Sequence, residues 1–208
     1  TTFNVKRLQF IETHIKGNVL KNNLARAVAF EELMKLDNHN NHEKFLQQFI
    51  LVNKSKAYLT EVFDLHNDIV NMSDGKKLPE LKLQNHQLEV ISTKQILKGP
   101  TVFYFWSQTQ MSHYRNSVLK VKLLEKLYPK YNFIGVCIQP FNEVVFEVHR
   151  MMNINPETQM AFTNFDKDSK KWVISLLNRA IIVDTDGKIK EGFGNFSASD
   201  FEDILKDN

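Results

Sequence analysis

One stretch, Thr101–Arg115, constrains the fold of this chain more than any other. Its first six residues, TVFYFW, are almost all apolar or aromatic on successive positions rather than on alternate ones. A strand with this pattern is typical of the centre of a sheet that helices cover on both faces. The polar residues after Trp106 lead into a segment with helical spacing. The sequence therefore predicts a buried strand that enters a helix through a polar turn, with a site just after Trp106.

The chain after this turn alternates between helical and strand-like segments. A helix is expected from Ser117 to Tyr128, a second buried strand at Phe133–Ile138 and a further helix at Phe141–Met152. A strand, helix, strand order predicts parallel pairing with a right-handed crossover. Ala161–Phe165 is interpreted as a short edge segment. Two apolar runs around Asp186-Gly187, within Asn178–Ile189, predict a β-hairpin.

The first third of the chain is expected to be helical. Apolar residues recur at helical spacing in three segments: Val19–Leu36, His42–Val52 and the residues from Ser55 to Met72. The polar, Gly-containing run Met72–Lys77 is interpreted as a linker. The predicted organisation is a helical region at residues 1–75, which packs as a bundle or cap or offers a groove to a partner, and an α/β domain at residues 76–208.

Composition excludes several classes of partner. The formal net charge is +3, from 27 basic and 24 acidic residues, and the lysines at positions 120, 122, 126 and 130 are interpreted as a solvated helix face. A nucleic-acid binder would need a concentrated basic patch, so none is predicted. No run of some twenty apolar residues predicts a membrane span. The chain begins at Thr1 without a leader, which fits a cytoplasmic protein or one cut after a signal.

Two scaffold motifs resemble thioredoxin-like proteins of the exported TlpA type. Pro79, Leu81, Leu83 and Gly99 follow the order of that family's opening strands, and Ile181–Ile189 matches its Leu-Ile-Asp-x-Asp-Gly-Lys-Ile hairpin. The resemblance covers about residues 78–205. It implies an α/β, thioredoxin-like mixed sheet flanked by helices, preceded here by the helical segment. It also implies a bacterial protein of the periplasm or cell envelope, with the cytoplasm as the alternative.

Both redox motifs of that family are lost. The resemblance places Gln110 and His113 where the Cys-x-x-Cys cysteines would stand, and Asn178 where the cis-proline would stand. Disulfide exchange needs an attacking thiolate and a second thiol, and this chain has one cysteine, Cys137. A cis bond before a residue other than proline costs roughly 2.5–4 kcal/mol, so the bond before Asn178 is expected to be trans. Cys137, within an apolar strand, is expected to be buried and inert.

The resulting hypothesis is a redox-inactive thioredoxin-like module. It binds a protein or peptide partner at the former active-site surface, and no cofactor, metal or catalytic residue is predicted. The residues expected to lie close together there are Trp106, Gln110, Met111, His113 and Asn178. The oligomeric state and the identity of the partner are left open.

The alternative is an enzyme with an atypical site, either a thiol-disulfide oxidoreductase or peroxiredoxin-like protein or a metal-binding variant. A peroxiredoxin-like alignment places Ser112 at the peroxidatic cysteine, but a hydroxyl lacks the sulfur chemistry. A Ser–His hydrolase based on Ser107 or Ser112 lacks the surrounding glycines.

Two sets of residues bear on metal binding. His39 and His42 flank an Asn-rich break and are interpreted as solvated. Soft or imidazole ligands for copper, as in Sco-like relatives, are Met111, His113, His149, Met151 and Met152.

Overall fold

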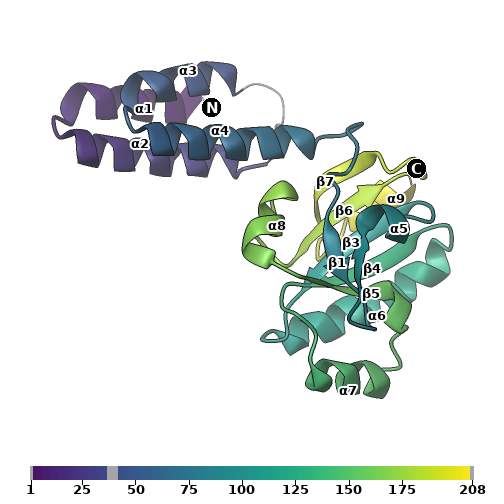
Figure 1. The fold of residues 1–208 in the computed structure, drawn as a ribbon. Helices are drawn as coiled ribbons and strands as arrows, with labels where there is room; N and C mark the ends of the chain where they lie inside the picture. Colours follow the sequence, from purple (N-terminus) through teal and green to yellow (C-terminus); the bar gives the residue numbers. More distant parts are fainter. Residues whose placement is uncertain (1, 37–41, 207–208) are drawn as a thin grey trace. The chain divides into compact units, whose positions relative to one another are not determined.

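A computed structural model describes residues 2–36 and 42–206 of the chain (Figure 1). The chain forms two compact units, Thr1–Val70 and Asn71–Asn208. Of the two histidines at the Asn-rich break, His39 lies outside the described residues. The other, His42, precedes a helix and packs edge-on against His66. No helix in the described ranges has the length and apolarity needed to cross a membrane.

The described part of the first unit consists of helices. They are α1 (Thr2–His14), α2 (Asn18–Leu33), α3 (Glu43–Val52) and α4 (Lys56–Asn71). The three predicted helical segments match α2, α3 and α4 to within a few residues. The sequence pattern does not define α1 separately, because its apolar residues do not form one stripe: Phe3 and Phe10 are exposed, whereas Asn4 is buried.

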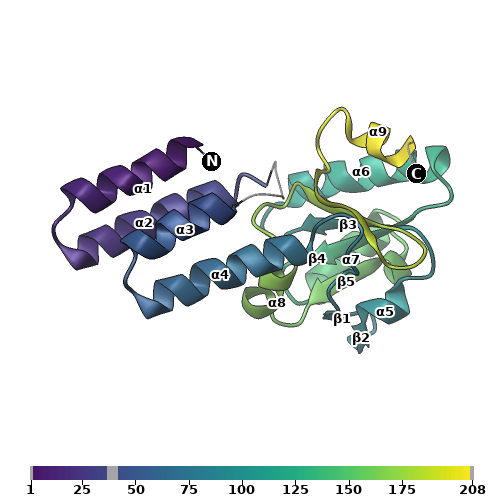
Figure 2. The same cartoon turned by 90° about the horizontal axis from the view of Figure 1, so that it is seen from above.

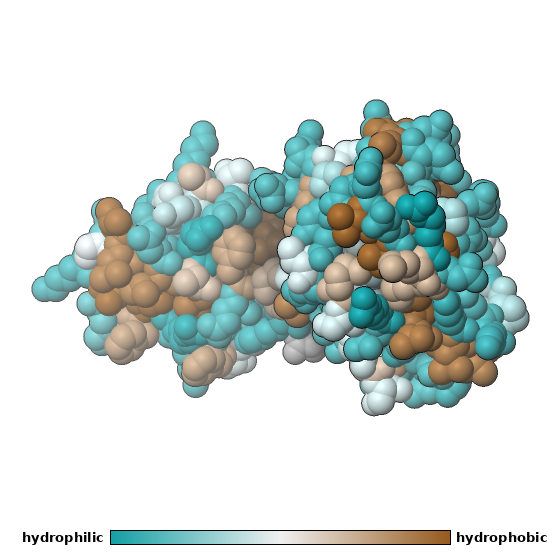
Figure 3. All heavy atoms as spheres, turned by 90° about the horizontal axis from the view of Figure 1, so that it is seen from below, coloured by the Kyte–Doolittle hydropathy of each residue, from teal (hydrophilic) through white to brown (hydrophobic). Residues whose placement is uncertain are grey.

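Polar contacts join the helices of this unit at several points. The Asn4 amide donates to Glu32 on α2 at 2.8 Å, and the Arg26 guanidinium binds both carboxylate oxygens of Glu61 on α4 at 2.5 Å. A bidentate pair of this kind fixes orientation as well as distance. Apolar side chains remain exposed over these helices, where Figure 3 shows brown patches at the left of the molecule. They include Phe3, Phe10, Val19, Leu20, Ile50 and Leu51.

The second unit is built on a mixed sheet. Within the described residues it has seven strands, in the order β2-β1-β5-β4-β3-β6-β7. The strands are β1 (Lys82–Gln84), β2 (Val90–Ser92), β3 (Thr101–Trp106), β4 (Asn132–Cys137), β5 (Gln159–Phe162), β6 (Arg179–Val183) and β7 (Ile189–Asn195). The helices are α5 (Thr93–Ile96), α6 (Met111–Leu127), α7 (Glu143–Met151), η1 (Pro156–Thr158), α8 (Phe165–Lys171) and α9 (Phe201–Lys206).

The two buried strands predicted from sequence lie side by side inside the sheet. β3 pairs in parallel with β4, with Trp106 opposite Cys137. Figure 2 shows α6 and α9 on one side of the sheet and α8 on the other. Tyr104 and Trp106 belong to the core under α6, whereas Phe103 packs against the Trp172 ring at 5.0 Å on the other face. This two-sided burial explains the continuous apolar run and confirms the predicted fold class.

One prediction about the sheet is wrong. The sequence pattern places an edge segment at Ala161–Phe165, but β5 spans Gln159–Phe162 and lies between β1 and β4. All four of its residues are buried. The misassignment has a physical reason: the strand is short, and its first residue is a glutamine that is polar in sequence but hydrogen-bonded inside the core.

The predicted hairpin is present at the opposite side of the sheet. β6 pairs antiparallel with β7. The Asp184 carboxylate accepts from the backbone N–H groups of Asp186 and Lys188 at 2.8 Å each, and Gly187 adopts a positive φ of 71°. A residue without a Cβ adopts this conformation without a steric penalty. The turn therefore follows from the Asp-x-Asp-Gly sequence.

The segment interpreted as a linker is bound to the second unit. The Gly75 N–H donates to the Ile189 carbonyl at 2.8 Å, and the Leu78 N–H donates to the Gly187 carbonyl at 3.0 Å. Met72 is buried. Met72–Lys77 thus runs beside β7, because its backbone pairs with the otherwise open edge of that strand.

The solvated lysine face predicted for α6 is only partly correct. Lys120 donates to the Phe196 carbonyl at 2.7 Å and to the Ala198 carbonyl at 3.1 Å, and burial lowers the pKa of its ammonium group. It therefore holds the loop before α9 in place. Lys122 similarly donates to the Met152 carbonyl at 3.0 Å.

The close approach of Gly192 to the Met72 backbone leads to a prediction. A Cβ added at Gly192 would lie 2.0 Å from the Met72 carbonyl oxygen, so Gly192→Ala forces a backbone shift. We expect a loss of about 1–3 kcal/mol in the free energy of unfolding, measured by urea denaturation with tryptophan fluorescence. Both tryptophans, Trp106 and Trp172, lie in the second unit.

Gly99→Ala is the matched control, because its added Cβ would meet only the Asn132 side chain, at 3.4 Å. Equal stabilities for the two variants would contradict the packing described for the segment before β1.

Candidate functional site

The turn after β3 is held by its own polar side chains. The Ser107 hydroxyl lies 2.8 Å from the Thr109 hydroxyl and accepts from the Thr109 N–H at 3.2 Å. The Gln110 N–H donates to the Ser107 carbonyl at 3.1 Å, and the Gln110 carbonyl accepts from the Tyr114 N–H at 3.1 Å to start α6. Side chains that bond locally in this way favour turns. The residues between Trp106 and α6 therefore form an ordered polar turn.

A second set of bonds joins this turn to the loop between β4 and α7. The Gln139 side chain accepts from the Gln108 N–H at 3.0 Å and donates to the Ser107 hydroxyl at 2.9 Å. The Gln108 side chain donates to the Pro140 carbonyl at 2.6 Å and accepts from the Asn142 amide at 2.7 Å. The two loops that follow the parallel strands β3 and β4 thus act as one polar surface.

Cys137 lies directly beneath this surface. Its side chain is fully buried, and burial raises the pKa of its thiol to about 11. The sulfur donates to Gln139 at 3.6 Å and accepts from Gln108 at 3.8 Å, so it takes part weakly in the polar network. A thiol in these surroundings is a poor nucleophile at neutral pH. The structure therefore confirms the expected burial of the lone cysteine.

A buried hydrogen-bond chain runs behind the turn and joins four elements. The Tyr114 hydroxyl lies 2.8 Å from His149 Nε2 and donates to Gln159 Oε1 at 3.2 Å, and Gln159 Nε2 donates to the Tyr104 hydroxyl at 3.0 Å. Burial raises the pKa of both tyrosines. Gly135 makes room for the chain, because a Cβ there would lie 2.5 Å from Gln159 Oε1.

The donors and acceptors of this chain fix the form of His149. The Gln159 carbonyl oxygen can only accept, so it takes the Tyr114 hydroxyl proton. The Tyr114 oxygen must then accept from His149, which places a proton on Nε2 and leaves Nδ1 as an acceptor. Burial, together with the neighbouring His86 ring at 5.5 Å, lowers the pKa of His149 to about 4. The imidazole is therefore neutral at pH 7.

A cavity of about 190 Å³ opens beside this chain, between α6 and α7. Trp106 and His149, both buried, line it, and Trp106 stacks on the Tyr114 ring at 3.9 Å. The exposed residues Asn142 and Val144 also line it, so they mark its mouth. The remaining lining residues are Gln108, Met111, Tyr114, Val145 and Val148. The cavity thus has a mostly apolar wall and aromatic rings at its closed end.

The structure brings some of the predicted site residues together. Trp106 and Met111 line the same cavity, and Gln110 is exposed at the start of α6. β3 and β6 pair antiparallel as far as Tyr104 opposite Ala180, and Asn178 directly precedes β6. The Asn178 amide donates to Asn195 at 3.1 Å.

The remaining predictions concern His113, the shared site and the peptide bond before Asn178. His113 does not line the cavity, and both of its ring nitrogens are buried without a hydrogen-bond partner among the described residues. The shared site of all five residues remains a proposal. Every peptide bond in the described ranges is trans, as expected for the bond before Asn178.

Five polar residues of the site are not predicted from sequence: Gln108, Tyr114, Gln139, Asn142 and Gln159. The sequence pattern suggests His149 only as a metal ligand. Asn142 gives a usable local signal, since it precedes α7 and its side chain accepts from the Val145 N–H as an N-cap. Tyr114 and His149 have no such signal, because 35 residues separate them in the chain.

The copper ligand set considered from the sequence does not converge. Met111 and His149 line one cavity, but Met151 is 86% exposed at the end of α7. Across residues 2–36 and 42–206, no group of three or more His, Cys, Asp and Glu side chains gathers in a geometry that could hold a metal ion.

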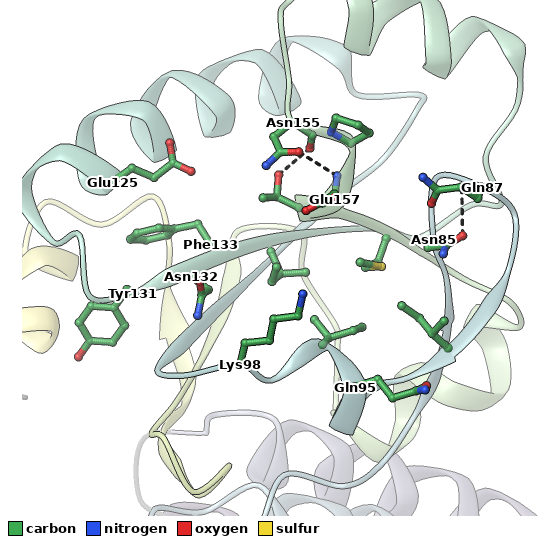
Figure 4. Close-up of a pocket in the computed structure, with 16 residues that line it drawn as sticks. Asn85, Gln87, Gln95, Lys98, Glu125, Tyr131, Asn132, Phe133, Asn155 and Glu157 are labelled. Atoms are coloured by element: carbon green, nitrogen blue, oxygen red, sulfur yellow. Dashed lines mark hydrogen bonds between the residues drawn. The ribbon is translucent and has the colours of Figure 1, made fainter.

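A larger cavity, about 460 Å³, lies at the opposite end of the parallel strands (Figure 4). Its lining includes Asn132 and Phe133 at the start of β4 and Thr158 before β5. The rim amides are engaged in local turns, since the Asn155 side chain accepts from the Glu157 N–H at 3.1 Å and the Asn85 side chain accepts from the Gln87 N–H at 3.0 Å. Ligands of open α/β sheets bind at the carboxyl ends of the strands, so the turn after Trp106 is the stronger candidate.

The burial of Cys137 leads to a prediction about its reactivity. At pH 8 a thiol with a pKa of about 11 is ionised in roughly one molecule in a thousand. We expect a chromogenic disulfide reagent to label Cys137 only after unfolding in guanidinium. A Ser112→Cys variant, with an exposed second thiol, is the control and should label at once in the native state. The burial of Cys137 would be contradicted if the reagent labelled it in the native state as fast as it labels the thiol introduced at position 112.

The same surroundings set the effect of Cys137→Ser. Gln139 and Gln108 can hydrogen-bond the new hydroxyl, so we expect a destabilisation of no more than about 1 kcal/mol, against about 1–3 kcal/mol for an unsatisfied hydroxyl. Urea denaturation of the variant and the wild type measures the difference. A loss at the upper end of that range would show that the two glutamines do not reach the hydroxyl.

The lowered pKa of His149 predicts an acid-dependent loss of stability. The folded state favours the neutral ring, so the contribution is fully present above the unfolded value of 6.5 and is lost as the pH falls through about 4. The shift corresponds to about 3 kcal/mol. His149→Gln should therefore flatten the dependence of unfolding free energy on pH between 6.5 and 4, measured by tryptophan fluorescence in urea.

Gln110→Ala, at an exposed position of the second unit, removes no titratable group, so it is the control and should keep the wild-type pH dependence. An unchanged slope in the His149 variant would show that this ring is not held neutral by the fold.

Comparison with known proteins identifies the fold. No family model and no curated protein matches the sequence. The thioredoxin domain of a thiol-disulfide oxidoreductase from Bacteroides vulgatus is similar in structure, with 16% identity, a TM-score of 0.51, and 64% of this chain and 96% of that chain covered. A thioredoxin-like protein from Bacteroides caccae matches with 8% identity and a TM-score of 0.59, covering 99% of this chain and 76% of that chain. At these identities the likeness shows the fold alone: the chain has a thioredoxin-like fold and a single cysteine.

Proposed function

We propose that this protein is a redox-inactive thioredoxin-like module that binds a segment of a protein partner at the surface after β3. In this proposal residues 76–208 form the binding domain and residues 1–75 form a separate helical region. The contact residues are those of the former redox surface: Trp106, Gln110, Met111, His113 and Asn178. The periplasm or cell envelope is the proposed compartment.

The state of the lone thiol is the observation that carries the proposal. Cys137 has no second cysteine to exchange with, and it is buried with a raised pKa. Disulfide exchange needs an accessible thiolate and a resolving thiol, and neither condition is met. The positions that would supply the two thiols carry an exposed amide, Gln110, and a partly buried imidazole, His113.

The ordered turn supports binding as the remaining role. The loops after β3 and β4 are joined by side-chain bonds from Gln108 and Gln139, so the surface is preorganised. Preorganisation lowers the entropy that binding must overcome. Exposed amides at Gln110 and Asn142, beside the partly buried Met111, offer both hydrogen bonds and apolar contact to an extended chain.

Selection of peptides tests this proposal directly. A random peptide library displayed on phage is panned on the full chain with dithiothreitol present, so that disulfide capture cannot contribute. A selected peptide is then titrated against ¹⁵N-labelled protein. We expect the backbone signals of Gln110, Met111 and Asn178 to shift, and Gln110→Ala to weaken binding about fivefold, the effect of one hydrogen bond of about 1 kcal/mol.

Asn132→Ala is the matched control, since this amide stands at the opposite end of β4 and should leave binding unchanged. A library that yields no binder would contradict the proposal. Selected peptides that shift only the protein signals of residues 2–70 would contradict it as well.

A further inference from the structure

The cavity between α6 and α7 contains two buried polar atoms without partners. Trp106 Nε1 and His149 Nδ1 make no hydrogen bond to any part of the chain that the structure describes. Both side chains line the cavity and both are at most 2% exposed. Buried polar groups in native proteins are almost always paired, so two at one cavity indicate a ligand that pairs them.

The two atoms have opposite roles. The indole N–H of Trp106 can only donate. The Nδ1 atom of His149 accepts, because the chain through Tyr114 and Gln159 places the ring proton on Nε2. The rings are 5.7 Å apart between centroids and meet edge to face. A ligand group that satisfies both must therefore present an acceptor and a donor close together.

Charge and size restrict the ligand further. A carboxylate has no proton for His149 Nδ1, and an ammonium has no acceptor for Trp106 Nε1. Either ion would also lose its hydration in a cavity walled by Met111, Val145 and Val148. The volume of about 190 Å³ lies below the roughly 300–1,000 Å³ of pockets for cofactors or drug-sized ligands. A single neutral side chain fits these limits.

We propose that the cavity is a specificity subsite that receives a side chain ending in a primary amide, as in glutamine, from the bound partner. The amide carbonyl accepts from Trp106 Nε1, and the amide nitrogen donates to His149 Nδ1. At the mouth, Asn142 and Gln108 already form an amide-to-amide bond of 2.7 Å, next to the exposed Val144. This inference rests on the proposed function, because it assigns the side chain that the partner inserts.

The two tryptophans provide a direct readout. Trp172 Nε1 donates to the Pro79 carbonyl at 2.8 Å, whereas Trp106 Nε1 has no partner among the described residues, so the two indole N–H signals are an internal comparison. The probe is N-acetyl-glutamine methylamide, titrated against ¹⁵N-labelled full chain. We expect a saturable shift of the Trp106 indole signal with a dissociation constant on the order of 1–10 mM. The Trp172 signal should stay in place.

Two further probes test the chemistry. The N-acetyl methylamides of glutamate and methionine have similar size but lack the neutral amide tip, and neither should produce a saturable Trp106 shift. The proposal would be overturned if the glutamine probe left the Trp106 signal unmoved up to roughly 50 mM, which is well above the expected dissociation constant. It would also be overturned if the glutamine probe moved this signal no more than the methionine probe does.

A pair of variants locates the effect. Val148→Phe fills the cavity and should abolish the response to the glutamine probe. Leu119→Phe, at an exposed position on the outer face of α6, should retain it. An unchanged Trp172 signal shows that each variant is folded, and the wild-type titration decides the question if Val148→Phe does not fold.

This experiment is independent of the test of the proposed function. Selected peptides that bind at Gln110 and Asn178 while the glutamine probe fails would refute the subsite alone. A glutamine probe that binds while no peptide is selected would refute partner binding but leave the cavity as a site for small neutral amides.

Discussion

The hydrogen bond between Tyr114 and His149 is the interaction on which the described site depends. It joins α6 to α7, and its continuation through Gln159 to Tyr104 reaches two strands of the sheet. Leaving any of these buried groups without its partner would cost about 1–3 kcal/mol, so the chain fixes how the two helices stand over the sheet. The position of α6 in turn sets Trp106 against Tyr114 and creates the cavity beside them.

This arrangement differs from a dithiol site in the form of the thiol that it stabilises: a dithiol site stabilises a thiolate, whereas burial here favours the neutral thiol. A redox site needs an accessible thiolate at the start of the helix, which positive charge or the helix N-terminus stabilises. Here the helix start carries Gln110, and the single thiol lies below the turn with its pKa raised. Ser107, Gln108 and Gln139 instead bind one another, so the turn is ordered mainly by bonds between neutral oxygen and nitrogen groups. The fold presents a preorganised surface, and its chemistry is that of hydrogen bonds between neutral groups.

The sequence predicts the scaffold more successfully than the site, for physical reasons. A continuous apolar run such as β3 is explained by burial on both faces, and the Asp184–Gly187 turn follows from local hydrogen bonds. β5 is misplaced because a buried Gln159 resembles a surface residue until its partners are known. The partner of Tyr114 is 35 residues away, so no local pattern could reveal it. The sequence therefore predicts the turn after Trp106 as the candidate site, whereas the residues behind that turn are identified only by the structure.

The protonation of His149 is the measurement that tests this account most directly. Long-range ¹H–¹⁵N correlation spectra of the folded protein at pH 7 report which ring nitrogen carries the proton. The account predicts a neutral ring with a protonated Nε2 and an unprotonated Nδ1, because Tyr114 must accept from it. A ring protonated on Nδ1 alone, or charged at pH 7, would contradict both the hydrogen-bond chain and the site built on it.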